Sequence, residues 1–112
     1  MIRRLNVKNH STEAFQRLYT QIQDIYSEIS ILSKKTPDGK INTFKLEFVN
    51  QLLSMANEVL SDQNKPFSDF STFSEDDMPS YSDVVLVISQ YLKCLERLNK
   101  DGIHLLSGRR SG

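Results

Sequence analysis

Two stretches of this chain have helical periodicity, and they differ sharply in how much of their circumference is apolar. In residues 11–35 the apolar positions alternate three and four residues apart, at Phe15, Leu18, Ile22, Ile25, Ile29 and Leu32. This spacing keeps one seam of a helix facing a partner helix. In residues 42–61 the apolar positions cover roughly 200°, at about 100° per residue, close to twice what a surface helix needs. The second helix must therefore be covered on more than one side.

Turn and capping residues set the expected boundaries. Ser11 or Asn9 can cap a helix over residues 11–35, and the segment 36–39, Thr-Pro-Asp-Gly, stops it, because proline cannot continue a helix and Asp-Gly favours a turn. A short connection makes the helix at 42–61, capped by Asn42 or Thr43, return antiparallel. A third helix is expected over residues 80–101, with Ser80 at its N-cap.

These elements predict an all-α fold, a three-helix bundle of up-down-up topology in one domain over residues 11–106. Residues 1–10 are expected to form a basic N-terminal arm or a short strand, and residues 107–112 a frayed tail. The helix at 42–61 should be the most buried element. We expect the centre of its buried face at Phe48, Leu52, Met55 and Val59.

The connection at 62–79 is too long for an ordinary loop, and it carries Phe67, Phe70 and Phe73 at every third position among acidic residues and serines. A flexible linker does not normally expose three phenylalanines. The favoured interpretation is that they dock onto the second and third helices. The alternative is that they insert into a groove of a partner protein.

The surplus apolar surface also favours self-association through the second and third helices. For this homodimer interface, or for a protein partner, the candidate residues are the linker phenylalanines together with Val49, Leu53, Leu60, Val85 and Leu92.

No catalytic, cofactor-binding or metal-binding motif is present. There is no glycine-rich phosphate loop, His10 and His104 lie at opposite ends of the chain, and Cys94 is the single cysteine, which fits a small buried hydrophobe and a reducing compartment. The acidic run 75–77 lacks the alternating spacing of a calcium loop. We therefore expect neither an enzyme, nor a cofactor, nor a metal site.

Charge and hydropathy restrict the partners. The 14 basic and 14 acidic residues balance, which is unlike most nucleic-acid-binding proteins, and no apolar run approaches the roughly 20 residues needed to cross a membrane. We predict a cytoplasmic, non-catalytic interaction module: a small homodimeric adaptor, scaffold or regulatory subunit. The alternative is a nucleic-acid-associated regulator that uses the basic arm, with Arg3 and Arg4, and the C-terminal Arg109 and Arg110. In the expected topology this arm lies near the acidic linker.

Overall fold

The computed structural model describes the backbone of residues 2–111 and the side chains of residues 13–99. The elements are helices α1 (Ile2–Lys35), α2 (Thr43–Val59) and α3 (Tyr81–Ser111), with one 3₁₀ turn, η1 (Glu75–Asp77), before α3. No β-strand occurs in the described backbone, only an isolated bridge between Lys40 and Ser80. The prediction of an all-α fold is confirmed.

The two outer helices are longer than predicted. Helix α1 begins at Ile2 rather than near residue 11, so residues 2–10 are neither an extended arm nor a strand. Helix α3 continues through Gly102 to Ser111 instead of ending at residue 101. Nothing in residues 2–10 obliges a helix to start later, since that stretch has neither proline nor glycine. A glycine inside a helix costs about 1 kcal/mol relative to alanine, which weakens the helix without ending it.

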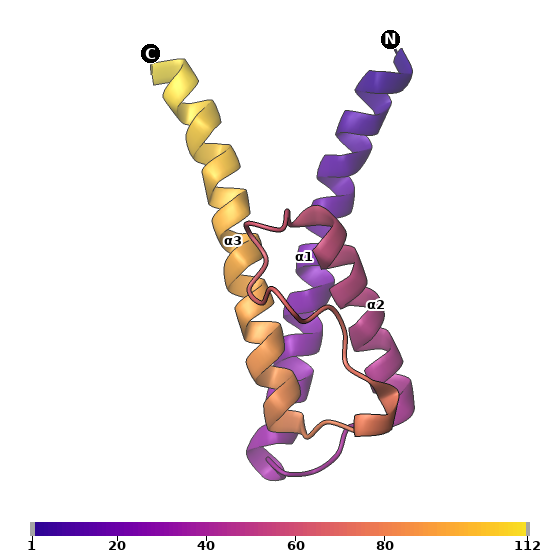
Figure 1. Ribbon diagram of the computed structural model, residues 1–112. Helices are drawn as coiled ribbons and strands as arrows, with labels where there is room; N and C mark the ends of the chain where they lie inside the picture. The colour runs from indigo at the N-terminus through magenta and orange to yellow at the C-terminus, as the bar shows by residue number, and fades with distance from the viewer. Residues whose placement is uncertain (1, 112) are drawn as a thin grey trace.

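The order of the helices in space corrects the expected up-down-up topology. Figure 1 shows that α1 and α2 run antiparallel, that α3 also runs antiparallel to α1, and that α2 and α3 therefore point the same way. The linker 62–79 has to travel back along the whole of α2 before α3 can begin. This return explains the linker's length, because a helix of 17 residues at about 1.5 Å per residue is about 25 Å long. It also places η1 and its acidic residues at the far end from the first turns of α1.

The loop between α1 and α2 caps the start of α3. The carbonyl oxygens of Pro37 and Gly39 accept hydrogen bonds from the backbone N–H groups of Ser82 and Tyr81, at 3.1 and 2.8 Å. These donors belong to the first turn of a helix, where no intrahelical acceptor exists. A Cβ on Gly39 would lie 2.9 Å from Thr36 Oγ1 and 3.0 Å from the Tyr81 ring, so only glycine allows this close approach.

The predicted N-terminal caps of α2 and α3 both form. Asn42 Oδ1 accepts from the Lys45 N–H at 2.8 Å, and Ser80 Oγ accepts from the Asp83 N–H at 3.2 Å. Each side chain thereby satisfies one of the free donors in its helix's first turn. The third helix therefore begins where the sequence indicates, immediately after Pro79.

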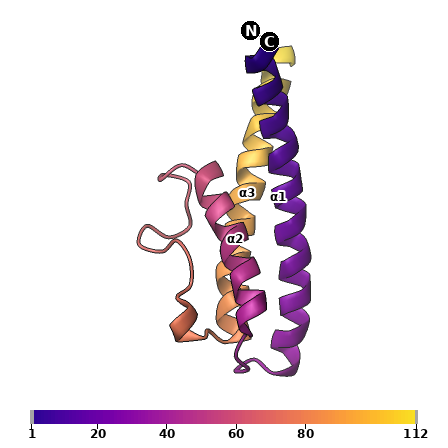
Figure 2. The same cartoon turned by 90° about the vertical axis from the view of Figure 1, so that its right-hand side faces the viewer.

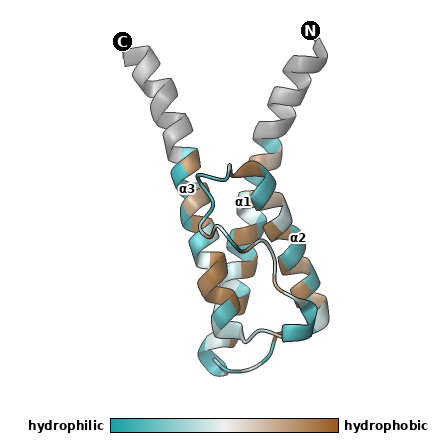
Figure 3. Cartoon of the chain, in the orientation of Figure 1, coloured by the Kyte–Doolittle hydropathy of each residue, from teal (hydrophilic) through white to brown (hydrophobic). Residues whose placement is uncertain are grey.

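One apolar core joins the three helices, and Figure 3 shows hydrophobic residues recurring along each of them within the described part. Its members are Leu18, Ile22, Ile25, Ile29, Ile41, Leu46, Val49, Leu52, Leu53, Ala56, Leu60, Val84, Ile88, Tyr91 and Leu95. The narrow stripe of α1 supplies four of them, as its spacing predicts.

The buried face of α2 is rotated from the predicted one. Leu52 is buried as expected, but Phe48, Met55 and Val59 are exposed and do not belong to the core. The buried centre lies instead at Val49, Leu53, Ala56 and Leu60. A wide apolar arc has no single obvious centre, and the sequence pattern alone did not show which part of it faces the other helices.

Candidate interaction surfaces

The linker is tied to one flank of α2 by two asparagines. The Asn50 amide makes two hydrogen bonds to the backbone of Phe73: Nδ2 donates to the carbonyl oxygen and Oδ1 accepts from the N–H, both at 2.9 Å. Two turns further along α2, Asn57 Nδ2 donates to the carbonyl oxygen of Ser71 at 2.9 Å. Asparagine is unfavourable in the interior of a helix unless its side chain has such a role. We call Asn50 and Asn57 the asparagine clamp.

Tyr91 of α3 completes this attachment. Its hydroxyl donates to Asn57 Oδ1 at 2.6 Å, so the clamp is held from a second helix. The side chain is fully buried in the core, and burial raises the pKa of its hydroxyl above the ordinary value of 10.0. The phenol therefore keeps its proton, and the donor that Asn57 needs, well above neutral pH.

The linker phenylalanines form a continuous ladder over α2 and α3. The rings of Phe67 and Phe70 lie 5.8 Å apart and those of Phe70 and Phe73 5.1 Å apart, both in edge-to-face geometry, and Phe67 lies 6.4 Å from the Tyr91 ring. All three phenylalanines are half-buried and pack against the core. This arrangement agrees with the favoured interpretation that they dock within the chain. As drawn in Figure 2, the linker lies on the side of α2 that faces away from α1.

Three predicted interface residues of α2 are not at the surface. Val49, Leu53 and Leu60 are each at most 2% exposed and belong to the core. They are corrected from interface to core positions, because the rotation of the buried face turns them toward α1 and α3. On α3, Val85 and Leu92 are half-buried against the core, so each retains only part of its surface for another molecule.

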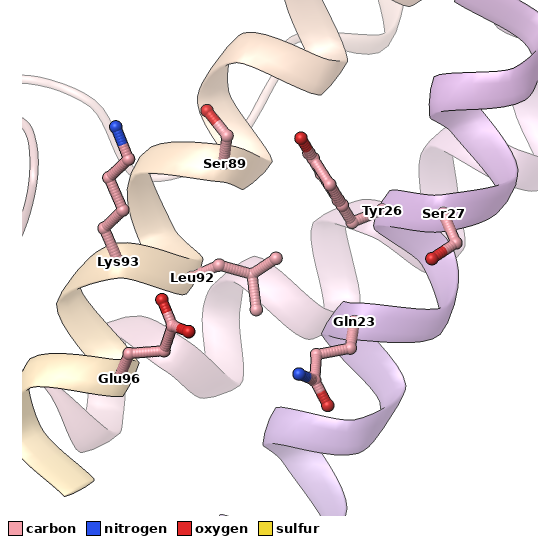
Figure 4. A pocket seen from close by; sticks show the side chains of 7 residues that line it. All are labelled: Gln23, Tyr26, Ser27, Ser89, Leu92, Lys93 and Glu96. Atoms are coloured by element: carbon pink, nitrogen blue, oxygen red, sulfur yellow. The ribbon is translucent and has the colours of Figure 1, made fainter. Parts of the chain in front are cut away.

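A shallow pocket of about 320 Å³ lies between α1 and α3 (Figure 4). It is lined by Gln23, Tyr26, Ser27, Ser89, Leu92, Lys93 and Glu96. Tyr26 and Leu92 both extend into the space between the two helices, and Lys93 points away. The Ser89 hydroxyl is engaged with the carbonyl oxygen of Leu86 at 2.7 Å. The lining therefore combines the polar side chains with the apolar side chain of Leu92 and the ring of Tyr26.

The other flank of α2 carries an apolar stripe that the chain covers only in part. Phe44 is 81% exposed, Phe48 38%, Met55 48% and Val59 39%. We call these four residues the α2 stripe. Their intervals of four, seven and four residues place them on one line along the helix. Single exposed apolar residues such as Ile31 and Leu86 are normal on a protein surface, but four in a row on one helix face are not.

Two hollows of about 280 Å³ each lie between α1 and α2, beside the α2 stripe. One hollow is lined by Ala14, Phe15, Arg17, Leu18, Gln21, Met55, Glu58 and Val59. The other is lined by Ile25, Glu28, Phe44, Lys45 and Phe48. We call this surface the α1–α2 groove. It is the place where apolar exposure, concavity and charge coincide in the described residues.

A signal for the asparagine clamp is present in the sequence. Two asparagines seven residues apart lie on one face of a helix, beside the apolar arc, and α2 is otherwise rich in good helix formers. The groove had no comparable signal, because the α2 stripe could not be told from the buried face before the rotation of α2 was known.

Several predictions concern residues beyond the described side chains. His10, Arg3, Arg4, His104, Arg109 and Arg110 lie outside residues 13–99, so the nucleic-acid alternative stays a prediction. The expectation that the basic arm lies near the acidic linker is wrong for residues 75–77, which lie at the opposite end of the bundle from the first turns of α1 (Figure 1).

Other classes of site find no support in the described part. Within residues 13–99 no three His, Cys, Asp or Glu side chains gather as metal ligands would. Cys94 is half-buried, packs against the core and is not in a disulfide. None of the described helices is both long and apolar enough to span a bilayer.

Comparison of the chain with protein-family models, with curated proteins and with solved structures finds no match in any of the three. The function therefore has to be argued from the surface of this molecule.

Proposed function

We propose that this protein is a non-catalytic interaction module, a small helical homodimer that acts as an adaptor, scaffold or regulatory subunit. The observation that carries the proposal is the exposed α2 stripe, set in the α1–α2 groove beside a core that is already complete without it. Phe44 has most of its surface in water, and Phe48, Met55 and Val59 each keep more than a third of theirs exposed. Their burial against another molecule would remove them from water, which is the main driving force of protein association.

The position of the linker supports the same conclusion. We place the second subunit on the α1–α2 side rather than over α2 and α3, because the linker and its phenylalanines already lie over α2 and α3. The α1–α2 side remains uncovered in the described chain. A helix pair with an apolar groove is a common docking surface for a further helix, and two such pairs form a four-helix arrangement. A cytoplasmic location, which the single unpaired cysteine fits, is part of this proposal.

Gel filtration coupled to light scattering tests the proposal. The mass of the wild-type protein should rise from that of one chain, 12.9 kDa, toward twice that value as the concentration is raised through the micromolar range. Phe44→Gln should weaken this association at least tenfold, because Phe44 is the most exposed member of the α2 stripe.

Leu86→Gln is the matched control, since Leu86 is 59% exposed on α3, away from the groove. This variant should associate as the wild type does. A single-chain mass at millimolar concentration would contradict the homodimer. Equal weakening by both substitutions would mean that association is unspecific.

A further inference from the structure

The four charged residues that line the α1–α2 groove alternate in sign. At one end Arg17 of α1 faces Glu58 of α2, and at the other end Glu28 of α1 faces Lys45 of α2. Each helix therefore carries one positive and one negative charge, in opposite order. Among the described residues none of the four forms an ion pair, and the apolar floor of the groove lies between them.

This alternation is self-complementary. A second copy turned by 180° about an axis that lies across the groove presents its Glu28 to Arg17 and brings its Lys45 to the level of Glu58. No charge then meets one of its own sign among these four. Arrangement of opposite charges across an interface selects the partner and its orientation, even where it adds little affinity. An isologous interface also requires that the same patch serve both copies, which this pattern satisfies.

The apolar residues and the charged residues of α2 have the same midpoint along the helix. On α2 the midpoint between Phe44 and Val59, and between Phe48 and Met55, falls between residues 51 and 52. The midpoint between Lys45 and Glu58 falls at the same place.

On α1 the midpoint between Arg17 and Glu28 falls between residues 22 and 23. Because Arg17 shares a hollow with Glu58, and Glu28 shares one with Lys45, the two midpoints lie at the same level of the helix pair. One two-fold axis therefore serves both helices.

A different two-fold axis, along the groove, would also oppose unlike charges, but it sets the α2 stripe against the exposed polar residues of α1. The axis across the groove sets stripe against stripe, with Phe44 on Val59 and Phe48 on Met55 of the other copy. Burying apolar surface against apolar surface is the favourable choice.

We propose that the α1–α2 groove binds a second copy of this chain groove to groove, with α2 antiparallel to α2 and Arg17 opposite Glu28 of the other copy. This inference rests on the proposed homodimer and adds its geometry. The groove is about 22 Å long between Phe44 and Val59 at about 1.5 Å per residue. Two helices wide, it buries on the order of 1,000 Å² in total, below the size of most permanent interfaces. A reversible dimer is therefore expected, whose mass depends on protein concentration.

Charge reversal measured by sedimentation velocity tests this geometry. Arg17→Glu should weaken dimerisation at least tenfold, because it places two carboxylates opposite each other at both ends of the α1 pair. Adding Glu28→Arg should restore association, since the pair is then reversed but still complementary. Adding Glu58→Arg to Arg17→Glu instead should not restore it. Lys93→Glu, an exposed reversal on α3 outside the groove, is the control and should associate as the wild type does.

The outcomes separate this inference from the proposed function. A wild-type dimer that is indifferent to Arg17→Glu would keep the homodimer and overturn this interface. Restoration by Glu58→Arg, and not by Glu28→Arg, would overturn the antiparallel α2 contact. A wild-type chain that stays single at 1 mM would overturn both. Circular dichroism of each variant shows whether lost association reflects lost folding. Restored association of the variant with both Arg17→Glu and Glu28→Arg would also show that Arg17→Glu does not act by unfolding the chain.

Discussion

The two flanks of α2 differ in whether the rest of the chain covers them. One flank has the asparagine clamp and is covered by the linker, whereas the other has the more apolar side chains of the α2 stripe and is bare. Hydrophobic attraction is non-directional and does not select a particular segment. Hydrogen bonds to backbone atoms at fixed positions do select one. The linker therefore lies on the flank that offers polar anchors, although the other flank is also apolar.

The linker also shows that anchors and apolar contacts act together. Ordering a residue costs about 1–2 kcal/mol of backbone entropy, so a long segment without regular structure needs several contributions to stay in place. Here the clamp fixes residues 71 and 73, while the ladder of Phe67, Phe70 and Phe73 contacts the core. Neither set of contacts occurs on the stripe flank.

The largest expected effect on stability comes from a substitution on the buried face of α2, which lies between the two flanks. Leu53→Ala should lower the free energy of unfolding by about 2–5 kcal/mol, because it leaves a cavity in a fully buried site. Urea denaturation followed by circular dichroism measures the change. Leu86→Ala on exposed α3 surface should change stability by less than about 0.5 kcal/mol. A small loss at Leu53 would mean that the buried face of α2 is not the one described.

Removing one anchor should loosen the covered flank selectively. Asn57→Ala deletes the donor to Ser71 and leaves the Tyr91 hydroxyl without its acceptor, so stability should fall by about 1–3 kcal/mol. Amide hydrogen exchange over residues 66–78 should accelerate more than exchange in α1.

Ser54→Ala, at an exposed position of α2, controls for the substitution itself and should leave exchange in the linker unchanged. Unchanged protection of residues 66–78 in Asn57→Ala would show that the phenylalanine ladder alone holds the linker.

The clamp should also make stability depend on alkaline pH. The folded-state pKa of Tyr91 is raised above 10.0 by burial, so its contribution is complete below about pH 10 and is lost as pH rises through the folded-state pKa. Tyr19, whose pKa is raised by burial and by the Glu96 carboxylate, adds to the same decline.

Urea midpoints of wild type and Tyr91→Phe should therefore differ at pH 8, and the advantage of the wild type should shrink as the pH rises above 10, since lysine titration affects both proteins alike. A constant difference across this range would show that Tyr91 does not titrate through unfolding.

Much of the fold was accessible from the sequence because it depends on local signals. The caps at Asn42 and Ser80, the stop after Lys35 and the core stripe of α1 each follow from residues within one or two turns. The ends of α1 and α3 were misplaced for the opposite reason: a weak helix former such as Gly102 does not decide a boundary by itself.

The direction of α3 and the rotation of α2 depend on contacts distant in sequence. The carbonyls of Pro37 and Gly39 cap α3 from about 44 residues away, and Asn50 bonds Phe73 across 23 residues. A pattern read along one helix does not contain such pairings. The α2 stripe was accordingly assigned to the core, and part of the true core, such as Leu53, to an interface.

The smallest expected effect on stability is also the sharpest comparison of the flanks, because the same substitution can be made on each. Phe44→Gln on the bare flank should change the free energy of unfolding by less than about 0.5 kcal/mol at low micromolar concentration, where the proposed dimer is expected to be dissociated. Phe70→Gln on the covered flank should lower it by about 1–3 kcal/mol, because this ring packs against the core and against Phe67 and Phe73. Urea denaturation at about 5 µM measures both.

At concentrations above the dimer's dissociation constant Phe44→Gln should become destabilising relative to wild type, since binding to the folded state adds stability by mass action. Equal losses for the two variants at low concentration would mean that the α2 stripe supports the fold of the single chain, and the difference between the flanks would disappear.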